Sequence, residues 1–273
     1  MTKKIFAKKS LGQNFLKSKK AIQQMIEAVS LKKGDMVIEI GPGKGALTGP
    51  ILESGAQLIA FELDERMIAY LEEKFASAIE SKQLIIVHRD ILEVDINSFV
   101  KNKEYKIIAN IPYYITNAIV RKFLEEEHQP SHMSLLMQKE VAERIVRRDG
   151  KESILALSVA LFASAKYLAT VHRRYFSPAP KVDSAILHIF NISHDALVNR
   201  KEEKKFFLLI RTAFAHKRKR VIKNLEQLAP KKFWEEIFEK LSLSQNVRAE
   251  EISLENWLRI FDFFIKNDNL KVN

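Results

Sequence analysis

Short apolar runs alternate with amphipathic stretches over the first 190 residues of the chain. Short runs rich in Val, Ile and Leu are typical of buried strands, and apolar residues three or four positions apart are typical of helices. The pattern predicts strands at 36–40, 57–61, 84–88, 105–109, 134–137, 166–171 and 184–190. Because strands that alternate with helices are joined by right-handed crossovers, we expect an α/β fold with a mostly parallel sheet of seven strands.

Helical spacing fills the stretches between these strands and continues beyond them. It predicts helices at 46–54, 65–75, 117–127, 139–147 and 154–164. After residue 195 the strand pattern stops, and helices are predicted at 206–214, 221–228, 233–241 and 254–264. A chain of 273 residues fits one large domain with a small appendage. We therefore predict an α/β domain at 1–197 and a small all-α domain at 198–273.

Glycines and polar residues stand where the predicted strands end. The turn Gly41-Pro42-Gly43-Lys44-Gly45 follows the first strand, Glu62 ends the second, Asp90 follows the third and Asn110 follows the fourth. In a doubly wound sheet, ligands bind outside the carboxyl ends of the strands. These residues therefore form one candidate site.

The glycine-rich turn indicates a ligand that carries a nucleoside. Glycines let the backbone approach a ligand without an intervening Cβ, and Glu62 is suited to accept hydrogen bonds from ribose hydroxyls. Gly41-x-Gly43-x-x-Ala46 also fits the looser dinucleotide pattern, so the turn alone does not separate NAD from S-adenosylmethionine. A turn that only packs is the alternative. Asp90 either accepts a hydrogen bond from an adenine amine or caps the segment that follows it.

The motif Asn110-Ile111-Pro112-Tyr113 favours chemistry on an adenine amine. The lone pair of that amine is conjugated into the ring, so it is a poor nucleophile. The Asn110 side-chain carbonyl and the main-chain carbonyl of Pro112 can accept its two hydrogens and leave the lone pair directed at an electrophilic methyl group. Pro112 stiffens the turn, and Tyr113 offers a flat face for an extruded base. The alternative is an Asx turn with a packed tyrosine.

Positive charge is concentrated at the two ends of the chain. The net charge is +11, and residues 1–20 hold seven lysines and no acidic residue. Residues 195–273 hold 17 basic and 12 acidic residues, which leaves the middle of the chain nearly neutral. This distribution predicts a polyanionic partner. Within the second basic region, Lys217, Arg218, Lys219 and Arg220 are candidates for phosphate contacts, and a solvated helix face is the alternative.

Composition excludes several other classes of protein. The chain has no cysteine, so it has no disulfide, thiolate metal site or cysteine nucleophile. Its longest nearly apolar run, 154–165, is shorter than the ~20 residues that a bilayer span requires. The lysines of residues 1–20 are not followed by the apolar block of a secretory signal. The seven histidines show no metal-ligand spacing, so we predict no metal site and a protein of the cytoplasm.

Seven segments, in order, resemble the KsgA family of small-subunit rRNA adenine-N6,N6-dimethyltransferases. They are Lys9-Ser-Leu-Gly-Gln-Asn-Phe-Leu16, Ile38-Glu-Ile-Gly-Pro-Gly-Lys-Gly45, Phe61-Glu-Leu-Asp64, Arg89-Asp90, Asn110-Ile-Pro-Tyr113, Met137-Gln-Lys-Glu-Val-Ala142 and Phe176-Ser-Pro-Ala-Pro-Lys-Val-Asp-Ser184. The resemblance implies a Rossmann-like S-adenosylmethionine-dependent methyltransferase that places four methyl groups on N6 of two adjacent adenosines. Those adenosines lie near the 3′ end of small-subunit (16S) rRNA, as free rRNA or within a precursor of the small subunit.

The resemblance also implies roles for individual residues. Asn14, Leu16, Gly41, Glu62, Asp90 and Asn110 would contact the cofactor. Asn110, Pro112 and Tyr113 would hold the target base, and Phe176 is similar to a second aromatic residue near that base. The alternative for Phe176 is a core aromatic ahead of two prolines. The helical domain would contact RNA, and we expect a monomer.

Two other functions remain open at this point. A large-subunit rRNA adenine methylase of the macrolide-resistance type shares the glycine loop and the Asn-x-Pro-Tyr motif. Leu11-Gly12 and the segment 176–184 favour the small-subunit enzyme over it. A non-catalytic RNA-binding assembly factor could keep the same fold. Glu62, Asp90, Asn110 and Tyr113 are intact, which favours an active enzyme.

Overall fold

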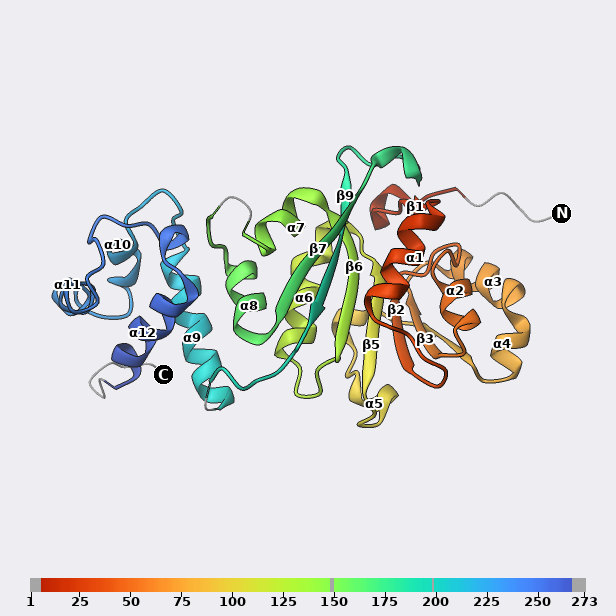
Figure 1. Cartoon of the computed structure of the whole chain (residues 1–273), viewed down its shortest axis with the longest axis horizontal. Coiled ribbons are helices and arrows are strands. Elements are labelled where there is room, and N and C mark those ends of the chain that lie inside the picture. The colour runs from red at the N-terminus through yellow and green to blue at the C-terminus, as the bar shows by residue number, and fades with distance from the viewer. Residues whose placement is uncertain (1–5, 148–149, 198, 267–273) are drawn as a thin grey trace. The chain divides into compact units, whose positions relative to one another are not determined.

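The chain divides into two compact units in the computed structural model, which describes residues 6–147, 150–197 and 199–266 (Figure 1). The first unit runs to Glu143 and resumes at Ala163–Ile192, and the second consists of Arg144–Phe162 and the chain from Ser193 onward. No helix within the described ranges combines the length and the apolar character needed to cross a bilayer.

A seven-stranded sheet forms the centre of the first unit, as predicted. Its order is β4-β3-β2-β5-β6-β9-β7. The strands are β2 (Met36–Ile40), β3 (Gln57–Glu62), β4 (Leu84–His88), β5 (Tyr105–Asn110), β6 (His132–Gln138), β7 (Ser164–Val171) and β9 (Ser184–Phe190). Strands β2 to β6 pair in parallel, and β9 runs antiparallel to both β6 and β7. The sheet is therefore mostly parallel.

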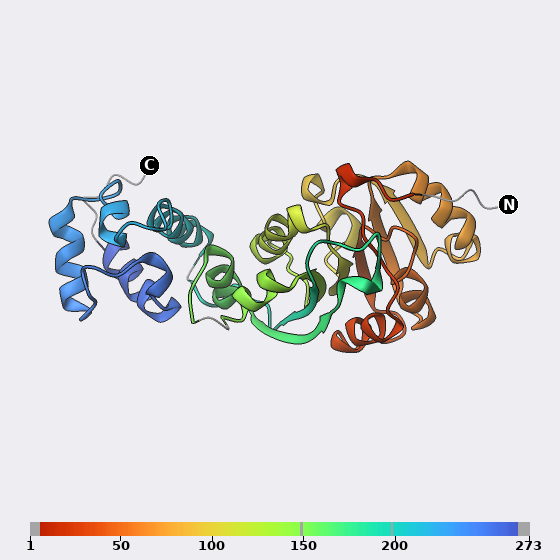
Figure 2. The same ribbon diagram turned by 90° about the horizontal axis from the view of Figure 1, so that it is seen from above.

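Helices cover both faces of this sheet, since its strands are apolar on both sides. They are α1 (Lys19–Ala28), α2 (Thr48–Glu53), α3 (Glu65–Lys74), α4 (Ala76–Glu80), α5 (Asn97–Val100), α6 (Thr116–Glu125) and α7 (Lys139–Ile145). Val37, Leu58 and Ile108 pack into one core with Met25 of α1 and Ile51 of α2. Seen from above, α1 and α6 lie on opposite sides of the sheet (Figure 2).

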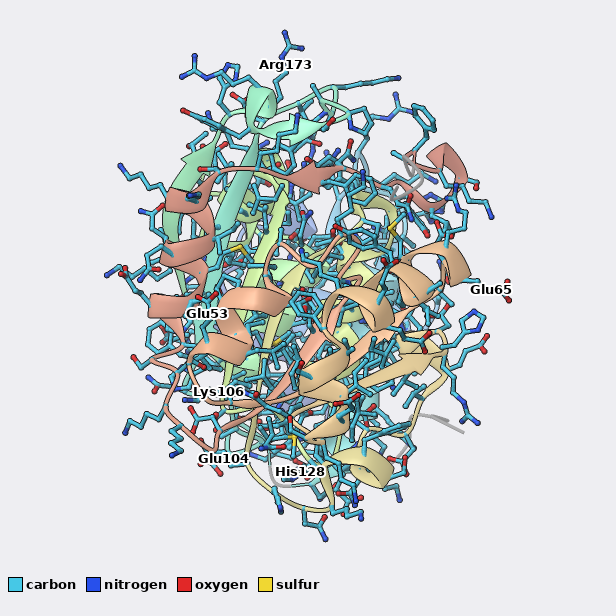
Figure 3. The ribbon with its side chains drawn as sticks, turned by 90° about the vertical axis from the view of Figure 1, so that its right-hand side faces the viewer. Glu53, Glu65, Glu104, Lys106, His128 and Arg173 are labelled. Atoms are coloured by element: carbon cyan, nitrogen blue, oxygen red, sulfur yellow. The ribbon has the colours of Figure 1, made fainter. Side chains whose placement is uncertain are left out.

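The parallel strands bring their carboxyl ends to one edge of the unit. Figure 3 shows Arg173, from the turn after β7, at one end, and Lys106, Glu104 and His128 at the other end. Because Lys106 is the second residue of β5, the Arg173 end is the end at which the parallel strands finish. The glycine turn and the polar residues that follow β2, β3, β4 and β5 therefore meet at that end.

A small second sheet at the same end was not predicted from the sequence. Its strands are β1 (Phe15–Leu16) and β8 (Phe176–Ser177), which pair antiparallel with Leu16 opposite Phe176. The chain directly after β1 is also tied, because the Lys17 N–H donates to the carbonyl of Tyr175 at 2.8 Å. The sheet therefore holds residues 11–17, called the N-terminal segment below, at the carboxyl ends of the strands.

The second unit is helical and includes a segment that sequence analysis assigned to the first domain. Its helices are α8 (Ile154–Phe162), α9 (Arg200–Ala213), α10 (Val221–Leu225), α11 (Lys231–Lys240) and α12 (Leu254–Ile265). The predicted ranges 1–197 and 198–273 differ from the compact units at Arg144–Phe162 and at 193–197. The reason is physical: α8 is apolar on all sides, and Phe162 packs against Phe207 of α9 with ring centroids 5.9 Å apart.

Candidate active site

A cavity of about 280 Å³ lies at the carboxyl ends of the parallel strands. Of the nine residues predicted for cofactor or target base, eight line it: Asn14, Leu16, Gly41, Glu62, Asp90, Asn110, Pro112 and Tyr113. They come from five separate stretches of the chain, and the fold brings them to one place. Their individual roles stay predictions, which the geometry below makes specific.

Phe176 is the exception and requires a correction. Its side chain is 3% exposed and belongs to the hydrophobic core beneath the small β1–β8 sheet, so it does not line the cavity. Pairing with Leu16 turns Phe176 inward, while the next residue, Ser177, faces the cavity. The structure thus assigns Phe176 the core position that the sequence left as the alternative.

The glycine turn leaves room for a ligand where a side chain would stand. A Cβ at Gly41 would meet no atom within 4 Å, and its φ of +65° lies in the left-handed region that glycine tolerates. At Gly43 a Cβ would come within 3.0 Å of the Phe15 ring, so that glycine allows the N-terminal segment to pack on the turn. Gly41 therefore faces open space in the cavity, whereas Gly43 leaves room for the Phe15 ring that lines the cavity.

Glu62 fixes the turn through its carboxylate. Oε2 accepts the Gly43 N–H at 3.0 Å, and Oε1 accepts the N–H groups of Leu63 and Asp64 at 2.9 and 3.0 Å. The side chain is nearly buried but still lines the cavity. A carboxylate oxygen can accept more than one hydrogen bond, so Glu62 can also accept from ligand hydroxyls.

Asp90 has the capping role that the sequence offered and also lies at the cavity, while its contact with an adenine amine stays a prediction. Its Oδ1 accepts the Leu92 N–H at 2.9 Å and caps the short helical turn Ile91–Glu93. The residue also lines the cavity. The capping bond fixes the carboxylate at the end of β4, and Oδ2 is suited to accept a hydrogen bond from a ligand amine.

The amide of Asn110 is oriented by the N-terminal segment. Its Nδ2 donates to the main-chain carbonyl of Asn14 at 2.9 Å. Because only the NH₂ group of the amide can donate, this bond fixes which way the amide points. No partner for Asn110 Oδ1 is found within the part of the chain that the structure describes. The Asn110 carbonyl oxygen therefore remains as an acceptor in the cavity wall.

The N-terminal segment is itself held by a carboxylate at the end of β3. Gln13 Nε2 donates to Asp64 Oδ2 at 2.9 Å, and Gln13 Oε1 accepts the Lys8 N–H at 2.7 Å. Arg66 donates to both carboxylate oxygens of Asp64, and these bonds lower the pKa of Asp64 to about 2. Asp64 is thus charged at neutral pH and anchors Gln13 of this segment beside the cavity.

The turn after β5 presents a carbonyl and an aromatic ring. The Pro112 carbonyl accepts the Ile115 N–H at 3.2 Å and retains a second lone pair. The hydroxyls of Tyr113 and Ser184 are 2.7 Å apart, and Ser184 is fully buried. Burial raises the pKa of the Tyr113 hydroxyl. Ser184, the first residue of β9, therefore anchors the far edge of the Tyr113 ring.

Glu39, Gln13 and Tyr114 are among the cavity residues that sequence reasoning missed. Glu39 carried a signal, since it is a charged residue inside the apolar strand 36–40. It is 1% exposed, and its Oε2 accepts the Thr48 hydroxyl hydrogen at 2.6 Å. The pKa of Glu39 is raised to about 8, mainly by burial and in smaller part by the nearby charge of Glu62. Glu39 is therefore largely protonated at neutral pH in the ligand-free protein.

We expect Glu39→Gln to remove a pH dependence of stability. A carboxyl group whose pKa is 4.5 when unfolded and about 8 when folded binds more protons in the folded state, so stability falls as pH rises from about 4.5 to 8. Over this whole pH range the free energy of unfolding changes by a few kcal/mol. The glutamine keeps an oxygen for Thr48 and does not titrate. Unfolding by urea at pH 5 to 8 should give a flatter profile for the variant, and parallel profiles would contradict the raised pKa.

The predicted phosphate-binding residues lie in the second unit. Lys217, Arg218, Lys219 and Arg220 are exposed in the turn between α9 and α10. Arg218, Lys219 and Arg220 line a hollow of about 440 Å³ together with Lys223, Lys231, Gln245 and Asn246. Lys223 and Lys231 pair with Glu226 and Glu235 at 2.7 and 2.9 Å. Over the described ranges, no such carboxylate partner is found for the side chains of Arg218, Lys219 and Arg220.

Comparisons with known proteins agree with this arrangement. A family model described as ribosomal RNA adenine dimethylase matches residues 5–266. Ribosomal RNA small subunit methyltransferase A of Fusobacterium nucleatum is 37% identical over 260 residues, which cover 94% of this chain and 97% of that protein. The protein of the same name from Mycoplasma capricolum is 33% identical over 269 residues, which cover 96% of this chain and 99% of that one.

Two solved structures share the fold over most of the chain. The 23S rRNA methyltransferase ErmE has a TM-score of 0.73 and 25% identity, covering 92% of this chain and 100% of that chain. A dimethyladenosine transferase from Plasmodium falciparum has a TM-score of 0.78 and 24% identity, covering 92% and 98%. At 24% identity, the similarity to the Plasmodium falciparum protein is evidence for the fold alone.

Proposed function

The chain belongs to the ribosomal RNA adenine dimethylase family, and from this premise we propose that it dimethylates N6 of two adjacent adenosines in small-subunit rRNA. The methyl donor is S-adenosylmethionine, which supplies an electrophilic methyl group. In each transfer the N6–CH₃ bond forms as the S–CH₃ bond breaks, S-adenosylhomocysteine leaves, and the methylated amine loses one proton to water. Four transfers replace both hydrogens of each of the two adenine amines.

The observation that carries this proposal is the orientation of Asn110. The Asn14 carbonyl holds the amide nitrogen, which leaves Asn110 Oδ1 as an acceptor in the cavity wall. The Pro112 carbonyl, two residues further on, offers a second acceptor. When both accept hydrogens of the adenine amine, its lone pair is less conjugated with the ring and becomes available to attack a methyl group.

We propose that the Tyr113 ring stacks on one face of the target base. Its hydroxyl is tied to Ser184, so the ring keeps one orientation and offers a fixed face for stacking. Extruding a base from its stack costs a few kcal/mol, and a prepositioned ring offsets part of that cost. The chemical contribution of the protein is thus positioning, together with exclusion of water by the closed N-terminal segment.

The cavity fits the methyl donor at both ends of its nucleoside. The open space at Gly41 accommodates the close approach of a ligand to the backbone. Glu62 would accept hydrogen bonds from the ribose hydroxyls, and Asp90 would accept one from the adenine amine of the cofactor. Asn14, Leu16 and Asn110 complete the wall between cofactor and target base.

The small-subunit rRNA is the substrate that the relatives favour. The curated relatives, 33–37% identical over nearly the whole chain, are named for the small subunit, whereas the likeness to a 23S methyltransferase is 25%. The intact acceptors and carboxylates favour an enzyme over a non-catalytic assembly factor. We further propose that the protein acts as a monomer in the cytoplasm, without a membrane partner.

Methylation of purified ribosomal subunits tests the proposed function. The protein is incubated with labelled S-adenosylmethionine and either unmethylated small subunits or large subunits, and the nucleosides are separated after digestion. We expect label in N6,N6-dimethyladenosine from small subunits alone. Label from large subunits would assign the chain to the macrolide-resistance type, and no label from either, with cofactor still bound, would leave a binding factor.

The hollow in the second unit is proposed to contact rRNA phosphates. Replacing Arg218, Lys219 and Arg220 together by Ala should weaken binding to small subunits and flatten its salt dependence. Each lost phosphate contact on a single strand reduces the slope of log K against log salt by roughly 0.7, so the triple variant should lose about 2 units. Binding is measured between 50 and 300 mM KCl.

A matched control uses the two paired lysines of the same hollow. Lys223→Ala with Lys231→Ala removes two cations whose charge is already balanced by Glu226 and Glu235. This variant should change the salt slope much less than the triple variant. Equal slopes in the triple variant and the wild type would show that the three cations are only a solvated surface.

A further inference from the structure

Tyr114 is an exposed aromatic residue at the edge of the active-site cavity. Its side chain is 63% exposed, although the residue lines the cavity. The other strongly exposed aromatic residues among those described are Phe6, Tyr175 and Phe263, and none of them lines it. What distinguishes Tyr114 from these residues is its place at the cavity edge, where a bound substrate can reach the ring.

The Tyr114 ring is supported on one side by the N-terminal segment. A Cβ at Gly12 would lie 3.3 Å from the ring atom Cε1 and 3.5 Å from Cβ of Pro112. Gly12 therefore packs directly beneath the ring, and its φ of +61° favours glycine there as well. The ring is held in place with its remaining surface open to solvent.

Tyr113 and Tyr114 are adjacent in the chain but have different surroundings. The Tyr113 hydroxyl is bonded to the buried Ser184, whereas Tyr114 leans on Gly12 and stays exposed. Both residues belong to one short helical turn, Tyr113–Ile115, which Pro112 precedes. Because the two rings are supported by different elements, Tyr114 is available to stack on a base other than the one beside Tyr113.

RNA that inserts one adenosine into the cavity leaves the neighbouring base without its stacking partner. An aromatic ring at the cavity edge replaces that partner, because any base can stack on it. We propose that Tyr114 is a stacking platform for the nucleotide adjacent to the target adenosine, an inference that rests on the proposed methylation of rRNA. Phe176, which is buried, cannot fill this role.

Steady-state kinetics on unmethylated small subunits test the platform. Tyr114→Ala should raise the KM for subunits by about 5- to 150-fold, the range that corresponds to one base–aromatic stack, and change kcat by less than twofold. Tyr114→Leu, which keeps apolar contact with Gly12, should behave like the Ala variant. Tyr114→Phe and Tyr114→Trp should retain the wild-type KM, since stacking needs the ring and not the hydroxyl. Calorimetry with S-adenosylhomocysteine should give the wild-type Kd for all four variants.

Several results would overturn the platform while leaving the proposed function intact. They are an unchanged KM in Tyr114→Ala, a loss confined to kcat, a Phe variant as poor as the Ala variant, or a loss of S-adenosylhomocysteine binding in Tyr114→Leu. Tyr175→Ala is the control for nonspecific contact of RNA with exposed aromatic residues, and an equal rise in its KM would also overturn the assignment. If the wild type methylates no subunit, the proposed function itself fails.

Discussion

Asn110→Ala is expected to reduce methyl transfer by about 10²- to 10³-fold, the effect of removing one prepositioned hydrogen-bonding group from a catalytic site. The variant removes Oδ1, which is the acceptor that the structure leaves in the cavity wall. The Kd values for small subunits and for S-adenosylhomocysteine should change by only a few-fold, because stacking and the carboxylates still hold both ligands. Single-turnover rates with bound subunits measure the effect directly.

Two further variants separate the acceptor from its orientation. Asn110→Asp keeps an oxygen but loses the donor, so a carboxylate would face the Asn14 carbonyl and turn away from it. We expect a loss between those of the wild type and the Ala variant. Asn117→Ala, which changes an exposed asparagine in the first turn of α6, should keep wild-type rates. Equal losses in binding and turnover for Asn110→Ala would assign the residue to ligand binding and not to activation of the amine.

The role of Asn110 shows what the sequence could predict and what it could not. Apolar runs mark the strands, and in a parallel sheet the residues at strand ends must converge. That Asn110, Glu62 and Asp90 share a cavity was therefore predictable. The bond from Asn110 to the Asn14 carbonyl was not, because it joins residues 96 positions apart through a main-chain atom. No side-chain pattern marks such a contact.

Phe176 and Tyr114 show the same limit for aromatic residues. Tyr114 follows a strand and Phe176 precedes two prolines, and neither position decides by itself whether the ring is buried or exposed. Burial depends on the two-residue strands β1 and β8, which are too short to leave a periodic pattern. The helix α1 was missed for a related reason, since its first residues, Lys19 and Lys20, extend the basic N-terminal stretch.

The chain near the N-terminus contains part of the predicted basic region. Lys3 and Lys4 lie outside the described residues, while Lys17 lines the cavity and is exposed. The lysines were expected to contact RNA near the cofactor, and that role stays a prediction. What the structure adds is that residues 11–17 form one wall of the cavity and orient Asn110.

Glu62→Gln is expected to lower the affinity for S-adenosylhomocysteine by about 100-fold, as two hydrogen bonds to a charged group are each worth about 1.5 kcal/mol or more. The carboxylate accepts three backbone N–H groups with its two oxygens. An amide has one oxygen, so its NH₂ group must face at least one of these donors. The turn that carries Gly41 and Gly43 should therefore loosen, and the ribose should lose its acceptor.

The same substitution should also cost stability, and the two effects can be separated. Leaving a buried N–H without an acceptor costs about 1–3 kcal/mol, which lowers the free energy of unfolding of the ligand-free protein. Glu53→Gln, an exposed carboxylate of α2 labelled in Figure 3, should change neither quantity. Affinity is measured well below the unfolding temperature of the variant. If Glu62→Gln is less stable but binds S-adenosylhomocysteine within threefold of the wild type, Glu62 only holds the glycine turn in place.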